Sequence, residues 1–157
     1  MHATLKPHHF LDLLCDIAEF GGVYTSSNPY GNLVPVYGSL LAQGNLDSVT
    51  FTADVDDICI PCNKLENGIC TIIFSDEVAK SYGVTRQYEY NLGLDNSFAK
   101  ALPEVFGFGV ERSIEEIFET LKEKLTYEII LLNWPKENRI DLTKRGLEMA
   151  IAARETK

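Results

Sequence analysis

The chain has 157 residues, of which 45% are hydrophobic and 24% are charged, and these values are ordinary for a globular protein. A chain of this length buries a core without disulfide bonds, so we expect a single domain and no disulfide framework. The net charge of -9 comes from acidic residues spread along the chain, and the basic residues form no patch with interleaved aromatic residues. This charge pattern argues against a nucleic-acid partner.

The sequence predicts no membrane-spanning or secretory segment. No run of about 18 apolar residues occurs. The first nine residues, MHATLKPHH, have no positively charged region that leads into an apolar stretch. We therefore expect a cytoplasmic protein with reduced cysteines and no membrane partner.

The first half of the chain predicts two helices and a strand. Pro7 to Phe20 has a proline in its first turn, apolar residues at helical spacing and Gly21-Gly22 at its end, which is typical of an amphipathic helix. Leu33 to Gln43 is expected to form a short helix that ends at Gly44. Ser48 to Asp54 alternates apolar and polar residues, as a strand with one buried face does.

The second half is expected to be mainly helical. Thr71 to Phe74 is predicted to be a short strand, so that a cysteine-containing loop hangs between two strands. Ser113 and Glu116 have the spacing of a capping box at the start of a helix. Tyr127 to Trp134 either continues that helix or forms a buried strand. The other predicted helices are Ser75 to Gly83, Ser97 to Val105, and Asp141 to Arg154.

Together these elements predict an α+β fold that is mostly helical. A small two-stranded element is expected to carry a cysteine-rich metal loop and to pack it against the first helix. No linker or repeat divides the chain, so residues 1–157 are expected to form a single domain. Within it, 1–109 is the predicted metal-binding part and 110–157 a helical C-terminal extension.

The four cysteines are the strongest functional signal. Cys59 and Cys62 are separated by two residues, and Cys70 follows after seven more. Gly68 permits the sharp reversal that returns this third sulfur to the first two. Because a chain of this size does not need cysteine for stability, the spacing indicates a metal centre. The alternative is four unrelated reduced cysteines in or near the core.

The first helix is predicted to supply further ligands from one polar stripe, which consists of His8, Asp12, Cys15 and Glu19 at about 100° per residue. A free cysteine normally lies on the apolar face, so the position of Cys15 among ligand-type side chains links this helix to the cysteine loop. Cys15 is therefore expected to be the fourth thiolate ligand. His8, Asp12, and His9 at the edge of the stripe are expected to ligate the metal or to support its ligands. For each histidine, a solvated residue in the first turn is the alternative.

These motifs resemble the DUF1284 family of small bacterial and archaeal proteins, which are described as candidate iron-sulfur proteins without an assigned activity. The resemblance rests on LKPHHFL at residues 5–11, GGVY at residues 21–24, and DDICIPC at residues 56–62 together with Cys70. It covers roughly the first half of the chain and implies that Tyr24 lines the site. The family pattern has a cysteine where this chain has Asp12. The resemblance therefore implies that Cys15, one turn further along, or Asp12 itself takes that role.

Four thiolates suit either an iron-sulfur cluster or a tetrahedral zinc ion. Structural zinc usually joins two short-spaced ligand pairs in a small domain, whereas here one ligand comes from a distant helix, which favours iron-sulfur. We therefore expect a metal-binding protein whose iron-sulfur cluster has a redox or small-substrate role and a redox partner.

Two other functions follow from the same cysteines. The first alternative is a structural zinc-binding module that serves protein–protein interaction. A thioredoxin-like dithiol is disfavoured, because the residues after Cys62 are too few and too turn-like for the helix that this dithiol requires.

Overall fold

A three-stranded sheet and the helix that follows its first strand form the centre of the molecule. The computed structural model describes residues 1–22, 29–126, 128–130 and 137–157. Strand β1 (His2–Leu5) pairs in parallel with β2 (Ser48–Phe51), and β2 pairs antiparallel with β5 (Glu111–Ser113). Because Lys6 alone joins β1 to helix α1 (Pro7–Phe20), the sheet fixes the place where α1 begins.

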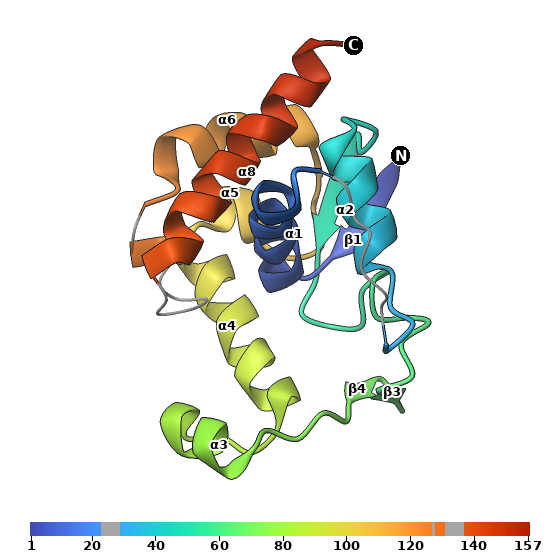
Figure 1. Cartoon of the computed structure of the whole chain (residues 1–157), viewed down its shortest axis with the longest axis vertical. Helices are drawn as coiled ribbons and strands as arrows, with labels where there is room; N and C mark the ends of the chain where they lie inside the picture. The colour runs from blue at the N-terminus through green and yellow to red at the C-terminus, as the bar shows by residue number, and fades with distance from the viewer. Residues whose placement is uncertain (23–28, 127, 131–136) are drawn as a thin grey trace.

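The other elements are α2 (Val34–Ala42), β3 (Leu65–Glu66), β4 (Ile69–Cys70), α3 (Asp76–Tyr82), α4 (Gln87–Ala101), α5 (Pro103–Phe106), α6 (Ile114–Lys124) and α8 (Glu137–Glu155). Helices α2, α6 and α8 lie around this centre, whereas α3 and the hairpin β3–β4 lie apart from it (Figure 1). Proline and glycine mark the ends of several helices. Helix α1 begins at Pro7 and ends before Gly21, which has φ 62°. Helix α4 ends at the residue before the Leu102-Pro103 pair.

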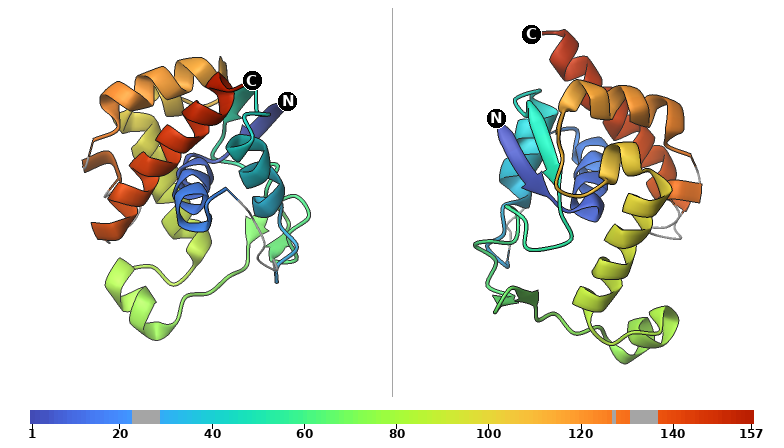
Figure 2. Two further views of the ribbon diagram at one scale, coloured as in Figure 1. Left: turned by 45° about the horizontal axis from the view of Figure 1, so that its top comes forward. Right: turned by 180° about the vertical axis from the view of Figure 1, so that it is seen from behind.

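Helix α8 packs against α1 and makes the C-terminal segment part of the same core (Figures 1 and 2). Gly146 permits this close approach, because a Cβ atom there would lie 1.7 Å from the Leu14 carbonyl oxygen. One turn along α1, Arg145 donates a hydrogen bond to the Ala18 carbonyl at 3.1 Å. The two helices are thus held at near backbone contact.

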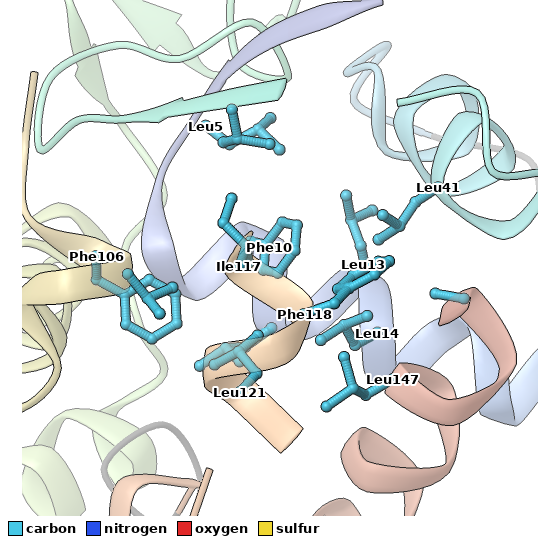
Figure 3. Packing of buried hydrophobic residues seen from close by; sticks show 14 of the residues in the cluster. Leu5, Phe10, Leu13, Leu14, Leu41, Phe106, Ile117, Phe118, Leu121 and Leu147 are labelled. Carbon is cyan, nitrogen blue, oxygen red and sulfur yellow. The ribbon is translucent and has the colours of Figure 1, made fainter. Parts of the chain in front are cut away.

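A single hydrophobic core joins α1 to the sheet, to α6 and to α8. In Figure 3, Phe10 lies between Leu5 of β1 and Ile117 of α6, while Leu14 faces Leu147 of α8. These residues are buried, and each apolar side chain of this size contributes about 1.5–3 kcal/mol through burial. The core therefore positions α1 independently of any ligand.

Several sequence predictions are confirmed. The fold is α+β and mostly helical, in a single domain. Helix α1 spans the predicted Pro7 to Phe20, and Ser75 caps α3. The Ser113 side chain accepts a hydrogen bond from the Glu116 N–H while Glu116 accepts one from the Ser113 N–H, so the capping box is formed.

Other predictions are wrong. Thr71 to Phe74 is no strand, because its sheet-type pairing within the described residues is a single antiparallel bridge between Ile73 and Arg86, which does not extend into a ladder. The two-stranded element is instead the hairpin β3–β4, which lies within the cysteine loop, while the predicted strand from Ser48 belongs to the central sheet. Strands β1 and β5 were not predicted, since neither is long enough to show alternation.

The predicted helix boundaries in the second half also need correction. The helix expected over Ser97 to Val105 is the last part of α4 followed by α5. Helix α8 begins at Glu137, so Asp141 lies inside it, where burial of Ile140 outweighs the modest helix propensity of aspartate. Of Tyr127 to Trp134, residues 128–130 are described and are helical; the others, like Tyr24, lie outside the described residues.

The segment 59–93, which we call the arm, differs from the rest of the chain. None of its residues is buried, whereas the core takes residues from the chain on both sides of it. Figures 1 and 2 show the hairpin, α3 and the first turns of α4 extending away from α6 and α8. Among the described residues, no helix is long and apolar enough to cross a membrane.

Candidate metal centre

Two carboxylates from distant parts of the chain cap the first turn of α1. Its N-cap residue, Lys6, offers no side-chain cap. Instead, the Lys6 N–H donates to Asp56 Oδ2 at 2.9 Å, and the His8 N–H donates to Asp95 Oδ1 at 3.0 Å. A helix N-terminus has unpaired N–H groups and a partial positive charge, so both carboxylates are stabilised there.

Asp56 also contacts His9 and Cys59, and these three residues form a group of possible metal ligands. His9 Nδ1 lies 2.7 Å from Asp56 Oδ2, and the Cys59 N–H donates to Asp56 Oδ1 at 3.1 Å. The ligand atoms of His9, Asp56 and Cys59 all lie within 4.8 Å of one another. No other group of three or more such side chains lies this close within the described part of the chain.

The electrostatics of the group follow from burial and from the carboxylate. Burial opposes the charge of Asp56, yet the His9 imidazole and the Lys6 N–H hold the pKa of Asp56 well below its usual range. Burial likewise disfavours the charge of His9, but Asp56 raises the pKa of His9 above its ordinary value. Burial and the nearby Asp56 raise the pKa of the Cys59 thiol to about 12. Burial and Asp56 therefore favour the protonated form of Cys59, while His9 and Asp56 favour each other's charged forms.

The chain before Cys59 is pinned to β1 and to the segment ahead of α2. Asp57 Oδ2 accepts a hydrogen bond from the Thr4 N–H at 2.7 Å, and the Asp57 N–H donates to the Thr4 carbonyl at 3.0 Å. Ile58 is buried, and its carbonyl accepts from the Leu33 N–H at 3.0 Å. Asp56 and Cys59 directly flank these two residues, so the hydrogen bonds of Asp57 and Ile58 hold both in place.

Cys62 and Cys70 belong to the same turn-and-hairpin unit as Cys59. The Cys62 N–H donates to the Cys59 carbonyl at 2.9 Å, the Leu65 N–H donates to the Cys62 carbonyl at 3.0 Å, and Leu65 pairs with Cys70 across the hairpin. Asn67 and Gly68, with φ 51° and 76°, form the two-residue turn. The chain reversal expected at Gly68 is thus present, whereas the expected return of the Cys70 sulfur to the other two stays a prediction. The sulfurs of Cys62 and Cys70 lie outside the 4.8 Å group of His9, Asp56 and Cys59.

Cys15 lies in a different environment. It is 1% exposed and faces α8, with Arg139 as its cationic neighbour, and burial raises the pKa of its thiol to about 11. Six residues separate it from His9, which corresponds to about 120° around α1 and about 9 Å along its axis. The structure therefore does not bring Cys15 together with Cys59, and its role as the fourth ligand stays a prediction.

The predicted stripe on α1 divides among separate partners. His8 Nδ1 lies 2.8 and 2.9 Å from the two oxygens of Asp95, and both side chains are buried. Asp12 Oδ1 accepts a hydrogen bond from Arg139 at 2.7 Å, and Glu19 is exposed. Because α8 covers the second half of α1, the stripe is not one polar surface directed at the cysteine loop.

His8 and His9 remain linked to each other. Their ring centroids are 4.2 Å apart at an interplanar angle of 51°, and each ring uses Nδ1 for its carboxylate. His9, which the helical angle placed at the edge of the stripe, is the histidine that approaches a cysteine. His8 is buried one residue away, so its expected ligand role stays untested by this geometry.

Sequence reasoning missed the roles of Asp56 and Asp95. Asp56 precedes Cys59 by three residues, and an aspartate that accepts the N–H of a residue just ahead is a common turn feature, so a local signal existed. Asp95 gave a weaker signal: it lies between Leu94 and Phe98, both buried, on the inner side of α4. A carboxylate on a buried face needs a partner, but the sequence does not show which one.

Comparisons with known proteins add no relative. No protein-family model matches the chain, and neither the curated proteins nor the solved structures contain a match. The resemblance to the DUF1284 family therefore stays an expectation from the sequence motifs. What can be said of function rests on the geometry around His9, Asp56 and Cys59.

Proposed function

We propose that this protein binds a transition metal through Cys59, Cys62, Cys70 and His9, and that Asp56 orients His9. The observation that carries the proposal is the position of the Asp56 carboxylate, which contacts His9 Nδ1 and the Cys59 N–H at the same time. Thiolate and imidazole are the donors that zinc and iron sites use. The donor set of this region therefore fits such a metal.

The hydrogen bond of His9 supports ligation through its other nitrogen. A metal-bound histidine usually donates its second ring N–H to a carboxylate or carbonyl, which fixes the tautomer and the ring orientation. Asp56 is fully buried and occupies His9 Nδ1, so Nε2 is the nitrogen left for a metal. His9 comes from α1, outside the hairpin unit, and takes the place that the sequence hypothesis gave to Cys15.

A mononuclear zinc ion is the first candidate. Three cysteines and one histidine form a closed tetrahedral set of the kind found in structural zinc sites. The hairpin unit supports this set because it links Cys62 to Cys59 and Cys70 through consecutive main-chain contacts. Zinc binding here requires that the thiol protons leave, which the raised pKa of Cys59 opposes until the metal is present.

An iron-sulfur cluster with a redox role is the second candidate. The specific observation in its favour is that three cysteines of one short loop are all partly accessible while the remaining ligand comes from a distant helix. Cysteine ligands with an occasional histidine are typical of such clusters. A protein partner that exchanges electrons would then have to approach the loop.

Metal analysis of the full chain tests the proposal. The chain is purified without oxygen, and zinc, iron and acid-labile sulfide are measured together with the absorption spectrum. We expect a colourless protein with stoichiometric zinc; a brown protein with iron and sulfide establishes the second candidate. Cys59→Ala and His9→Ala should each lose the metal, while Cys15→Ala, the matched control, should retain it. A wild-type chain that binds neither metal after reconstitution contradicts the proposal.

A further inference from the structure

The arm lacks the features that fold a segment by itself. Its hairpin has two residues in each strand and α3 has seven residues, and none of these elements has a buried residue. Isolated hairpins and short helices of this size are marginal in water, because they bury too little apolar surface to offset the entropy of ordering the chain. Something outside the arm's own packing must therefore order it.

The apolar contacts within the arm are few and half-exposed. Phe74, Tyr82 and Tyr90 form a small cluster, with ring centroids 4.4 to 5.9 Å apart, and none of the three is buried. Ile60 and Ile73 are 65% and 73% exposed. This cluster joins α3 to the start of α4, and α4 also contacts strand β4, but none of these contacts buries a residue of the arm.

Both ends of the arm lie at the first turn of α1. We call the described residues outside the arm the body. The arm begins at Cys59, beside Asp56 and His9, and it ends just before Leu94 and Asp95, where Asp95 contacts His8. The two histidines are neighbours in sequence and their rings are in contact. At the C-terminal end of the arm, the buried pair of Asp95 and His8 forms without a metal. The N-terminal end of the arm adjoins the cysteines.

We propose that metal binding orders the arm, so that residues 60–93 are folded against the body when the centre is occupied and are unfolded when it is empty. This inference rests on the proposed function. Ligation of Cys59, Cys62, Cys70 and His9 would tie the hairpin to α1, and the free energy of metal binding would appear as folding free energy of the arm. The buried core around α1, α6 and α8 contains no residue of the arm, which contacts it through the partly buried Tyr90, and this core stays folded in both states.

The His8–Asp95 pair limits the change to the arm. Asp95 is 1% exposed, accepts a hydrogen bond from the His8 N–H and contacts His8 Nδ1. The part of α4 that begins at Asp95 therefore remains attached to α1. Phe98, three residues further, is fully buried in the core. We therefore expect the boundary between the segment that unfolds without metal and the segment that stays folded to lie within α4, close to Leu94.

Hydrogen–deuterium exchange of the full chain tests the inference. Exchange is measured with zinc added and after zinc is removed by a chelator, and peptides from the arm are compared with peptides from α1, α6 and α8. We expect amides of residues 60–93 to exchange at least about tenfold more slowly with zinc, while the body peptides do not change. Cys15→Ala should behave as the wild type, and Cys59→Ala should show the unprotected arm in both conditions.

The outcomes separate this inference from the proposed function. Stoichiometric zinc with an arm that exchanges equally with and without it overturns the inference and leaves the metal centre intact. A body that loses protection together with the arm also overturns it. A chain that binds no metal contradicts the proposed function itself. If the metal is an iron-sulfur cluster, exchange is compared between the reconstituted and the apo protein.

Asp95→Asn should keep the zinc stoichiometry and extend fast exchange from the arm into α4.

Discussion

Cys15, a fully buried residue of α1, and Cys59, a partly buried residue next to α1, are both thiols, yet their surroundings differ in chemistry. Cys59 adjoins a histidine and a buried carboxylate and begins a turn that leads to two further cysteines. Cys15 lies beneath α8 with Arg139 nearby and with the aspartates of its own helix around it. Burial raises the pKa of both thiols, to about 12 and about 11. A suitable donor neighbourhood, rather than burial or helical angle, distinguishes a candidate ligand.

The two ends of α1 explain this difference. At its N-terminus, free N–H groups attract Asp56 and Asp95, and each carboxylate in turn holds a histidine. In its second half, the close packing of α8 leaves room for Cys15 only as a buried side chain of the helix interface. Single substitutions can therefore disturb one end of α1 at a time.

The largest effect is expected for Asp56→Ala. Removing this carboxylate leaves the Lys6 N–H and the His9 ring without their acceptor, while the Cys59 N–H keeps only the carbonyl of residue 56; breaking a buried, hydrogen-bonded pair costs about 3–5 kcal/mol. Chemical denaturation of the metal-free chain measures the loss. Asp54→Ala, an exposed aspartate of the same segment, is the control and should change stability by less than about 0.5 kcal/mol. Equal effects for the two variants would contradict the role of Asp56.

Gly146→Ala should disrupt the other end of α1. The added Cβ would lie 1.7 Å from the Leu14 carbonyl oxygen, so α8 must shift, at a cost of about 1–3 kcal/mol or more. In an unstrained helix the same change would stabilise the protein by up to about 1 kcal/mol. We expect a lower unfolding midpoint and faster reaction of Cys15 with a thiol reagent, with unchanged metal binding. Stabilisation would show that the two helices are not in close contact.

Asp16→Asn should stabilise the protein above neutral pH. Burial, followed by the nearby Asp12, raises the pKa of Asp16 to about 6. A carboxyl group with a raised folded-state pKa stabilises the fold fully below its unfolded value near 3.8, and this contribution is lost as the pH rises through about 6. Since the side chain is partly exposed, we expect a gain of about 1 kcal/mol at pH 8 and none at pH 4. Denaturation at both pH values checks this; an equal change at both contradicts it.

Sequence reasoning succeeded where the signal was local. The span of α1 followed from Pro7, the apolar spacing and Gly21, and the start of α6 from Ser113 and Glu116, because capping chemistry acts over three or four residues. The hairpin turn at Asn67-Gly68 is local as well, although only its glycine was used. Strands β1 and β5 escaped, since their pairing with β2 spans the chain and leaves no pattern in so few residues.

The candidate site was only partly predictable for the same reason. The spacing of Cys59, Cys62 and Cys70 marks one loop, and in the structure they lie on one turn and the hairpin that follows it, while their shared role as ligands stays a prediction. The side of α1 that meets this loop depends on α8, which covers Cys15 and leaves His9 toward Asp56. Which side of α1 is covered by α8 depends on contacts between residues more than a hundred positions apart, such as Arg139 with Asp12.

The most direct test of the account compares Co²⁺ binding by wild type, His9→Ala and Cys15→Ala. Thiolate ligands give cobalt intense charge-transfer absorption, so a titration reports affinity and thiolate ligation together. If His9 completes the centre, Cys15→Ala keeps the wild-type spectrum and affinity, and His9→Ala weakens binding by more than the about 10- to 100-fold that loss of a group supporting a ligand costs. A spectrum that loses thiolate absorption in Cys15→Ala and stays unchanged in His9→Ala would contradict the account and restore Cys15 as the fourth ligand.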